Sequence, residues 1–468
     1  AREVATWFDL PLKPRKWPLT ELPQPTSDFI DIQILDPQLC PRYCGLVVKG
    51  VKVGPSPDWL RQRIEQIGLR PINNVVDVSN YVCFSLAQPI HTFDLSKING
   101  PRIIVRKARK GETIRTLEGI LLELDPEMLV IADETRPVAI AGVIGGQESG
   151  ITENTTEVFI ESANFNPISI RQTAKKLGLS TEASYRFERG VDPNAAPEGA
   201  LMVASLLCNF GGRASRGLLD VFPGAKKLRT VPLRLSRIAE LLGVEIEPEF
   251  VVKTLSGLGL TLKEQKKNVW TAEIPSFRVD LEREADLIEE VARFYGYDKI
   301  PSEVTPVKSF DLPADKKRDK IWRLKEVLFH HGFDEVINFS FADPEKEEIW
   351  QAGYRPIKLQ NPISSKASIL RTSLLPGLVE NAVWNFNREA EGVHIFEVGN
   401  IYFWEEDQVH QEKLTLGLLT TGVRKAQTWQ QARQETDFFV LKGAVEDLFN
   451  YLGYDHISYE PLDHPFFE

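Results

Sequence analysis

Residues 275–301 read PSFRVDLEREADLIEEVARFYGYDKIP, and this stretch indicates how the surrounding chain is organised. Its apolar residues recur with the period of an α-helix, and one face collects Leu281, Ala285, Ile288, Ala292 and Tyr295. Gly296 follows as a stop signal. The pattern therefore predicts a helix over residues 280–297.

The first turns of this predicted helix are acidic. Asp286, Glu289 and Glu290 are spaced three and four residues apart, so we expect them on one side of the helix, with Asp280 capping it and pointing toward them. Convergent carboxylate oxygens are the ligands that Mg²⁺ prefers. The alternative is that these acids only complement the helix dipole, at about 0.3–1 kcal/mol each. The residues alone favour this second interpretation, because acidic helix faces are common.

Length and composition narrow the class of protein. A chain of 468 residues has room for about three domains. Its net charge of −10 argues against general nucleic-acid binding, which depends on neutralising phosphates. The longest uncharged apolar stretch, at 137–146, is about half a membrane span, so no membrane association is expected. Four cysteines are too few for a disulfide framework and favour a reducing, cytoplasmic location.

The sequence pattern predicts a multidomain α+β chain with four segments. Residues 1–40 are rich in proline and read as a strap with a partial domain. Residues 41–225 are mostly strands, including a predicted hairpin over 102–119 that turns at Lys110-Gly111. Short helices follow over 226–302, and a further α/β segment covers 303–468.

Two titratable residues and a glycine run stand out in the second segment. Strand alternation in EVFIESANF (157–165) places Glu161 on the same face as Phe159, where it could enter an apolar site; an acid facing water is the slightly favoured alternative. His91, in QPIHTFD (88–94), reads more readily as a local hydrogen-bonding residue than as a base. The glycines of AGVIGGQESG (141–150) lack the lysine of a phosphate-binding loop and indicate a close approach of backbone to a strand or ligand.

These segments together resemble the beta subunit of bacterial-type phenylalanyl-tRNA synthetase. The resemblance covers essentially the whole chain and is carried by 275–301 and by RPINNVVDVSNYV, QPIHTFD, AGVIGGQESG, EVFIESANF, STEASYRFERGVDP, LQNPISSKASILRTSLLPGL and IFEVGNIYF. It implies an editing (tRNA-deacylation) domain over 41–225, a small helical, winged-helix-like domain over 226–302, and a class II synthetase-like antiparallel-sheet module over 303–468. The family's oligonucleotide-binding and C-terminal anticodon-binding domains are missing from the sequence, which implies a fragment.

The resemblance also implies a function and partners. An alpha subunit would use ATP to charge tRNA(Phe) within an alpha2-beta2 tetramer, while the beta chain hydrolyses tyrosine attached in error to that tRNA. The module over 303–468 would be inactive, because HIFEVG carries Ile395 where an active class II motif has arginine two residues before Glu397. Two alternatives stay open: a non-catalytic scaffold with an idle editing pocket, and a stand-alone tRNA deacylase, which the long C-terminal module disfavours.

Site residues are carried over motif by motif. His91 and Thr181 would serve the hydrolytic reaction, with His91 helping to place a water near the ester. Glu161 would accept the tyrosine hydroxyl, and Gly145 and Ala183 would line the pocket. Glu182 stands where many members have aspartate. The family's Mg²⁺ ligands, at the contact with the alpha subunit, would fall on Asp280, Asp286, Glu289 and Glu290, which reverses the preference for the dipole interpretation.

Overall fold

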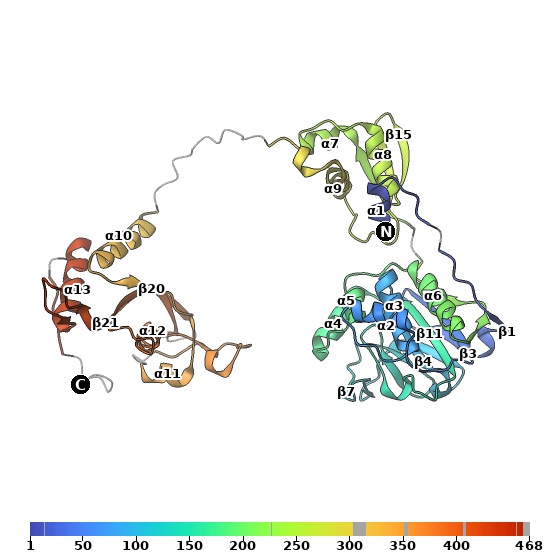
Figure 1. Cartoon of the computed structure of the whole chain (residues 1–468), viewed down its shortest axis with the longest axis horizontal. Helices are drawn as coiled ribbons and strands as arrows, with labels where there is room; N and C mark the ends of the chain where they lie inside the picture. Colours follow the sequence, from blue (N-terminus) through green and yellow to red (C-terminus); the bar gives the residue numbers. More distant parts are fainter. Residues whose placement is uncertain are drawn as a thin grey trace. The chain divides into compact units, whose positions relative to one another are not determined.

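The chain folds into two compact units of mixed α and β structure, Ala1–Thr305 and Pro306–Glu468 (Figure 1). The structure is a computed structural model that describes residues 1–13, 15–225, 227–302, 315–350, 354–405, 409–454 and 456–461. Several separate sheets accompany the helices, so the α+β class is confirmed. Within these described ranges, no helix combines the length and the apolar character needed to cross a membrane.

The first unit is built around a sheet whose strands come from distant parts of the sequence. Its order is β1 (Glu21–Pro25), β12 (Arg213–Arg216), β3 (Arg42–Lys49), β11 (Glu157–Asn164) and β4 (Ile90–Asp94), and β13 (Leu219–Val221) also pairs with β3. The central strands β3 and β11 are buried along almost their whole length, because both faces of the sheet are covered.

Helices cover one face of this sheet and a second sheet covers the other. The helical face packs α2 (Asp58–Gln66), α3 (Asn74–Leu86) and α6 (Ala195–Asn209) against Val158 and Ile160 of β11. Phe159 points to the opposite side, into a core shared with the second sheet. That sheet runs β10 (Ile144–Gly145), β9 (Pro137–Ile140), β8 (Leu129–Ala132), β5 (Arg102–Lys107) and β2 (Asp31–Ile34). The predicted alternation along β11 is therefore confirmed.

Two local predictions differ from the structure. The hairpin over 102–119 does not form: β5 pairs with β2 and β8, while β6 (Thr113–Arg115) pairs with β7 (Leu121–Glu123). Residues 1–40 are more than a strap, since they contain α1 (Arg2–Trp7) and contribute β1 and β2 to the two sheets. In both cases long-range strand pairing overrides a local signal.

The acidic segment belongs to a smaller group of strands and helices in the same unit, with a hydrophobic core of its own. A three-stranded sheet of β14 (Thr230–Arg234), β16 (Val269–Glu273) and β15 (Thr261–Lys266) packs with α7 (Leu235–Leu242), α8 (Pro248–Gly257) and α9 (Glu284–Tyr295). Helix α9 starts at Glu284, four residues later than predicted, because the backbone N–H groups of Glu282 and Arg283 donate to the side chain of Asp286. Asp280 consequently lies in the loop before the helix.

The second unit centres on a long antiparallel hairpin. β20 (Gly392–Trp404) and β21 (His410–Lys425) lie between β17 (Asp334–Glu335) and β22 (Gln434–Glu435). Helix α12 (Leu375–Phe386) packs on one face, and α10 (Lys316–His330) and α13 (Phe438–Leu452) pack on the other. The short elements are β18 (Phe341–Ala342), β19 (Ile369–Leu370) and α11 (Pro344–Ile349). The start of the segment predicted over 303–468, residues 303–314, lies outside the described residues.

Candidate functional site

A cavity of about 290 Å³ lies in the first unit, and its walls come from both sheets and from a short helix. All five residues to which the family resemblance gave an editing role line this one cavity: His91, Gly145, Glu161, Thr181 and Ala183. They come from β4, β10, β11 and the start of α5 (Glu182–Phe187). Most of the remaining wall is apolar and includes Pro89, Leu117, Ile131, Ala139, Ile140 and Phe187.

Glu161 supplies a carboxyl group to this apolar wall. The residue is only 5% exposed, so the water-facing alternative is wrong. Among the described residues, its hydrogen-bond partner is Tyr43 of β3, whose hydroxyl donates to Oε2 at 3.0 Å. Burial raises the pKa of Glu161 to about 8, and the hydrogen bond from Tyr43 opposes that rise. Burial therefore favours the protonated form of this carboxyl group at neutral pH.

His91 lies directly opposite Glu161 in the antiparallel pair of β4 and β11. Its ring meets Phe93 edge-on, with 4.4 Å between the ring centroids. Nε2 is buried and has no hydrogen-bond partner among the described residues. Burial lowers the pKa of His91 to about 4, so the imidazole is neutral at pH 7. A neutral imidazole can accept a hydrogen bond from water or donate one, according to its tautomer.

Gly145 explains part of the glycine run. A Cβ atom at this position would lie 2.4 Å from Cε1 and 2.7 Å from Nε2 of His91. Only glycine lets the backbone of β10 come this close to the imidazole ring. The predicted close approach of backbone to another group is thus present, and the group is a side chain of the cavity itself.

Thr181 has a structural task that the sequence did not reveal. It caps α5: its hydroxyl donates to the carbonyl of Val143 at 2.8 Å and accepts from the N–H of Ser184 at 3.0 Å. Its proton is therefore already in use, and a catalytic role for this hydroxyl stays a prediction. The cap holds the first turn of α5, with Ala183, against the cavity.

Sequence reasoning missed two residues of the site. Tyr43 donates a hydrogen bond to Glu161, and Leu117 lines the cavity. Tyr43 lies in RYCGLVVK of β3, a strand that local patterning recognises only as apolar. Its contact with Glu161 spans 118 residues and follows from the register of β3 against β11. The Tyr43–Glu161 contact could have been predicted only from the register of β3 against β11.

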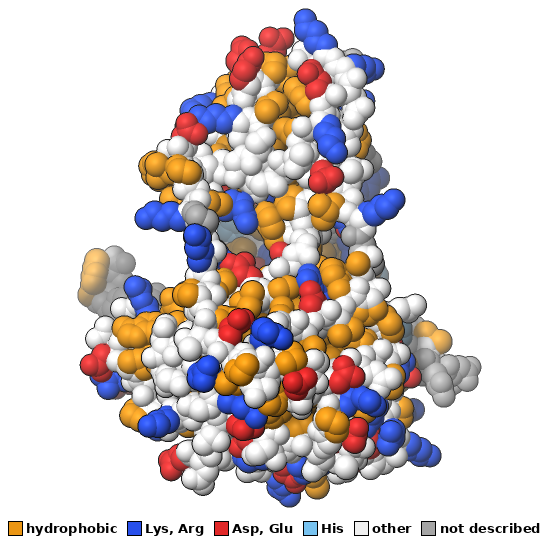
Figure 2. All heavy atoms as spheres, turned by 90° about the vertical axis from the view of Figure 1, so that its right-hand side faces the viewer, with side chains coloured by type: hydrophobic (Ala, Val, Ile, Leu, Met, Phe, Trp, Pro, Cys, Tyr) orange, Lys and Arg blue, Asp and Glu red, His pale blue; other side chains and the backbone are white. Residues whose placement is uncertain are grey.

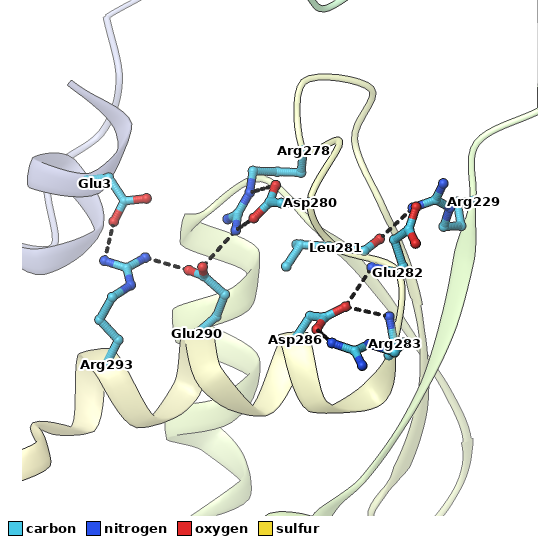
Figure 3. Close-up of polar contacts among 10 residues, drawn as sticks. All are labelled: Glu3, Arg229, Arg278, Asp280, Leu281, Glu282, Arg283, Asp286, Glu290 and Arg293. Carbon is cyan, nitrogen blue, oxygen red and sulfur yellow. Dashed lines mark hydrogen bonds and ion pairs between the residues drawn. The ribbon is translucent and has the colours of Figure 1, made fainter. Parts of the chain in front are cut away.

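The acidic segment is held by arginines rather than gathered into one cluster (Figure 3). Arg278 donates to Asp280 at 2.9 Å and to the buried Glu290 at 2.7 Å, and Arg293 pairs with Glu290 from the other side. Arg293 also pairs with Glu3 of α1 at 2.7 Å. Burial opposes ionisation of Glu290, yet the two guanidinium groups keep its pKa below the ordinary value.

This arrangement does not fit the predicted magnesium site. Asp286 accepts hydrogen bonds from Arg283 and from the backbone of Glu282, whereas Asp280 and Glu290 share Arg278, and Glu289 is exposed. Across the part of the chain that the structure describes, no three His, Cys, Asp or Glu side chains are grouped so as to hold a metal ion. Binding of Mg²⁺ by Asp280, Asp286, Glu289 and Glu290 therefore stays a prediction, and it would require these arginine contacts to be displaced.

Glu397 of the HIFEVG motif, in the second unit, is a structural residue. It is buried, pairs with Arg371 at 2.6 Å and accepts from Nδ2 of Asn338 at 2.8 Å. Arg371 in turn donates to the carbonyl of Asn400 at 2.9 Å. These contacts join β20 to the loops beside it.

Models of known protein families match successive parts of the chain. The B3/4 domain matches residues 39–212, the tRNA synthetase B5 domain matches 231–297, and the phenylalanyl tRNA synthetase beta chain CLM domain matches 300–468. The cavity falls within the first match, and α9 falls within the second.

Curated relatives match over nearly the entire chain. The phenylalanine–tRNA ligase beta subunits of Carboxydothermus hydrogenoformans and Moorella thermoacetica are each 39% identical over 99% of this chain. That of Geobacter sulfurreducens is 37% identical over the same share. The chain spans 59% of the length of each of these relatives.

A solved N-terminal fragment of the phenylalanyl-tRNA synthetase beta-subunit from Pyrococcus horikoshii is 14% identical and matches 63% of this chain and 81% of its own. Its TM-score is 0.32, which is too low to establish a common fold.

Proposed function

Because the chain belongs to the phenylalanine–tRNA ligase beta-subunit family, we propose that it acts as the beta subunit of such a ligase and that its cavity hydrolyses tyrosine from misacylated tRNA(Phe). An alpha subunit would bind ATP and charge the tRNA, within an alpha2-beta2 complex in the cytoplasm. Ester hydrolysis would be the chemistry of this chain itself.

The observation that carries the editing proposal is the buried carboxyl group of Glu161 in a mostly apolar wall. A synthetic site that is apolar rejects an added hydroxyl group only about a hundredfold, so a second site that requires the hydroxyl is useful. Tyrosine would pair its phenol with Glu161. Phenylalanine would leave the buried carboxyl group without that partner, at a cost of about 1–3 kcal/mol.

The other cavity residues have distinct tasks in this proposal. His91, neutral at pH 7, would hold a water molecule near the ester. Its Nε2 is buried beside Gly145, so this step requires β10 to move when the aminoacyl end enters. Thr181 would keep α5 and Ala183 in place through its contact with Val143.

Contacts with the tRNA backbone would come from dispersed basic residues. Figure 2 shows a face on which Lys and Arg side chains are interspersed with Asp and Glu, as expected for a chain of net charge −10. Phosphate contacts position a nucleic acid without reading its sequence. The cavity would then select the amino acid, while the alpha subunit and scattered cations hold the tRNA.

The proposal is tested by incubating preformed Tyr-tRNA(Phe) and Phe-tRNA(Phe) with the protein, alone and assembled with an alpha subunit. Release of tyrosine by the assembled complex, but slowly by the chain alone, is the expected result. Equal, fast release by the chain alone would favour a stand-alone deacylase. No release from an assembled complex would favour a non-catalytic scaffold.

A further inference from the structure

Tyr43 and Glu161 form a buried pair across two central strands. In the register of β3 and β11, Tyr43 is opposite Ala163 and Glu161 is opposite Gly45. Gly45 has no side chain to fill the position facing Glu161, and Tyr43 reaches that carboxyl group from the diagonal position, as long aromatic side chains can. Tyr43 is 0% exposed, and its hydroxyl lies 3.0 Å from Oε2.

This pair leaves one carboxyl oxygen available. Oε2 accepts the hydrogen bond from Tyr43, whereas Oε1 has no hydrogen-bond partner among the described residues. Tyr43 is the one hydrogen-bond partner of the carboxyl group among the described residues, and the last torsion of a glutamate side chain is broad and soft, so this hydrogen bond favours one rotation of the group. We propose that Tyr43 is a specificity-determining positioning residue: it fixes the Glu161 carboxyl group so that Oε1 faces the cavity and reads a phenolic hydroxyl. This inference rests on the proposed editing function.

The same hydrogen bond influences the protonation of Glu161. Tyr43 donates to the carboxyl group and favours its ionised form, against the larger effect of burial. The other titratable groups near the pair are Cys40 and Cys44 beside Tyr43, His91 on β4, and Glu118 and Glu182 in the cavity lining. Removing the Tyr43 hydroxyl alone should therefore raise the pKa of Glu161, while the identities of the other titratable residues around it stay the same.

The test is Tyr43→Phe in the complete complex with the alpha subunit, since the substitution keeps the buried ring. We expect the ratio of kcat/KM for Tyr-tRNA(Phe) over Phe-tRNA(Phe) to fall about five- to tenfold, the loss expected for one buried hydrogen bond. Phe-tRNA(Phe) hydrolysis should stay the same, and the pH midpoint of tyrosine selectivity should move upward. Tyr81→Phe, on α3, is the matched control and should change neither quantity.

A double-mutant cycle separates positioning from a merely structural role. In a Glu161→Gln background, Tyr43→Phe should change the ratio no further, because Tyr43 acts through the carboxyl group. An unchanged ratio in Tyr43→Phe, or the same loss in both backgrounds, would overturn the inference while the editing function stands. Absence of tyrosine selectivity in the unmodified complex would instead overturn the proposed function and this inference with it.

Discussion

Replacing Glu161 by glutamine should remove a large part of the pH dependence of folding stability. The pKa of Glu161 is raised from an ordinary 4.5 to about 8 by burial, so the folded chain holds this proton more tightly than the unfolded chain does. The stabilisation is fully present below pH 4.5 and is lost as pH rises toward 8. At about 1.4 kcal/mol for each pH unit, the loss between pH 5 and pH 8.5 is about 4 kcal/mol. Glutamine does not titrate and imitates the protonated acid.

The assay is urea unfolding of the first unit at pH 5 and pH 8.5, for the unmodified chain and for Glu161→Gln. The two proteins should be similar at pH 5, and the variant should be more stable by about 4 kcal/mol at pH 8.5. Because burial lowers the pKa of His91 to about 4, its contribution to folding stability decreases as pH falls below 6.5. Both proteins contain His91, so this contribution cancels when their stabilities are compared. Glu157→Gln, on the same strand in a half-buried pair with Lys49, is the control and should leave the pH dependence unchanged. Parallel pH profiles for Glu161→Gln and the unmodified chain would refute the reasoning.

Two further substitutions test the arginine network and the close approach at the cavity. Arg278→Met should lower the free energy of unfolding by about 2–4 kcal/mol, because the buried Glu290 loses one of its two partners. The control Arg237→Met, which breaks an exposed ion pair, should lower it by less than about 0.5 kcal/mol. Equal effects of the two substitutions in urea unfolding would contradict this prediction. Gly145→Ala should displace the His91 ring, which lies 2.4 Å from the added Cβ, and slow Tyr-tRNA(Phe) hydrolysis at least about tenfold. An unshifted His91 resonance in NMR spectra, with full activity, would show that β10 yields instead.

Local sequence patterns predicted individual strands and helices better than they predicted which strands pair with one another. The alternation in EVFIESANF placed Glu161 on the face of Phe159, and the structure confirms it. Whether that face is buried depends on the second sheet, which β2, β5, β8, β9 and β10 build from residues 31–145. The 102–119 hairpin failed for the same reason, since β5 finds its partners in β2 and β8. No local signal carries such pairings.

The acidic helix shows the same limit for side-chain contacts. Its periodicity predicted α9 within a few residues, but spacing along a helix cannot show what lies beside it. Arg278 precedes the helix and bridges Glu290 to Asp280, and Arg293 in the last turn bridges Glu290 to Glu3, so guanidinium groups occupy the space between these acids. The cavity residues were found together because the resemblance supplied them as a set, while Tyr43 was missed because its contact depends on strand register alone.

The most direct measurement of the central claim is the ratio of hydrolysis rates for Tyr-tRNA(Phe) and Phe-tRNA(Phe), in complexes assembled with the unmodified chain and with Glu161→Ala. If the buried carboxyl group reads the phenolic hydroxyl, the unmodified complex hydrolyses the tyrosyl ester faster, and the variant loses about five- to 150-fold of that ratio. A variant that folds, assembles and keeps the ratio would contradict the assignment of Glu161.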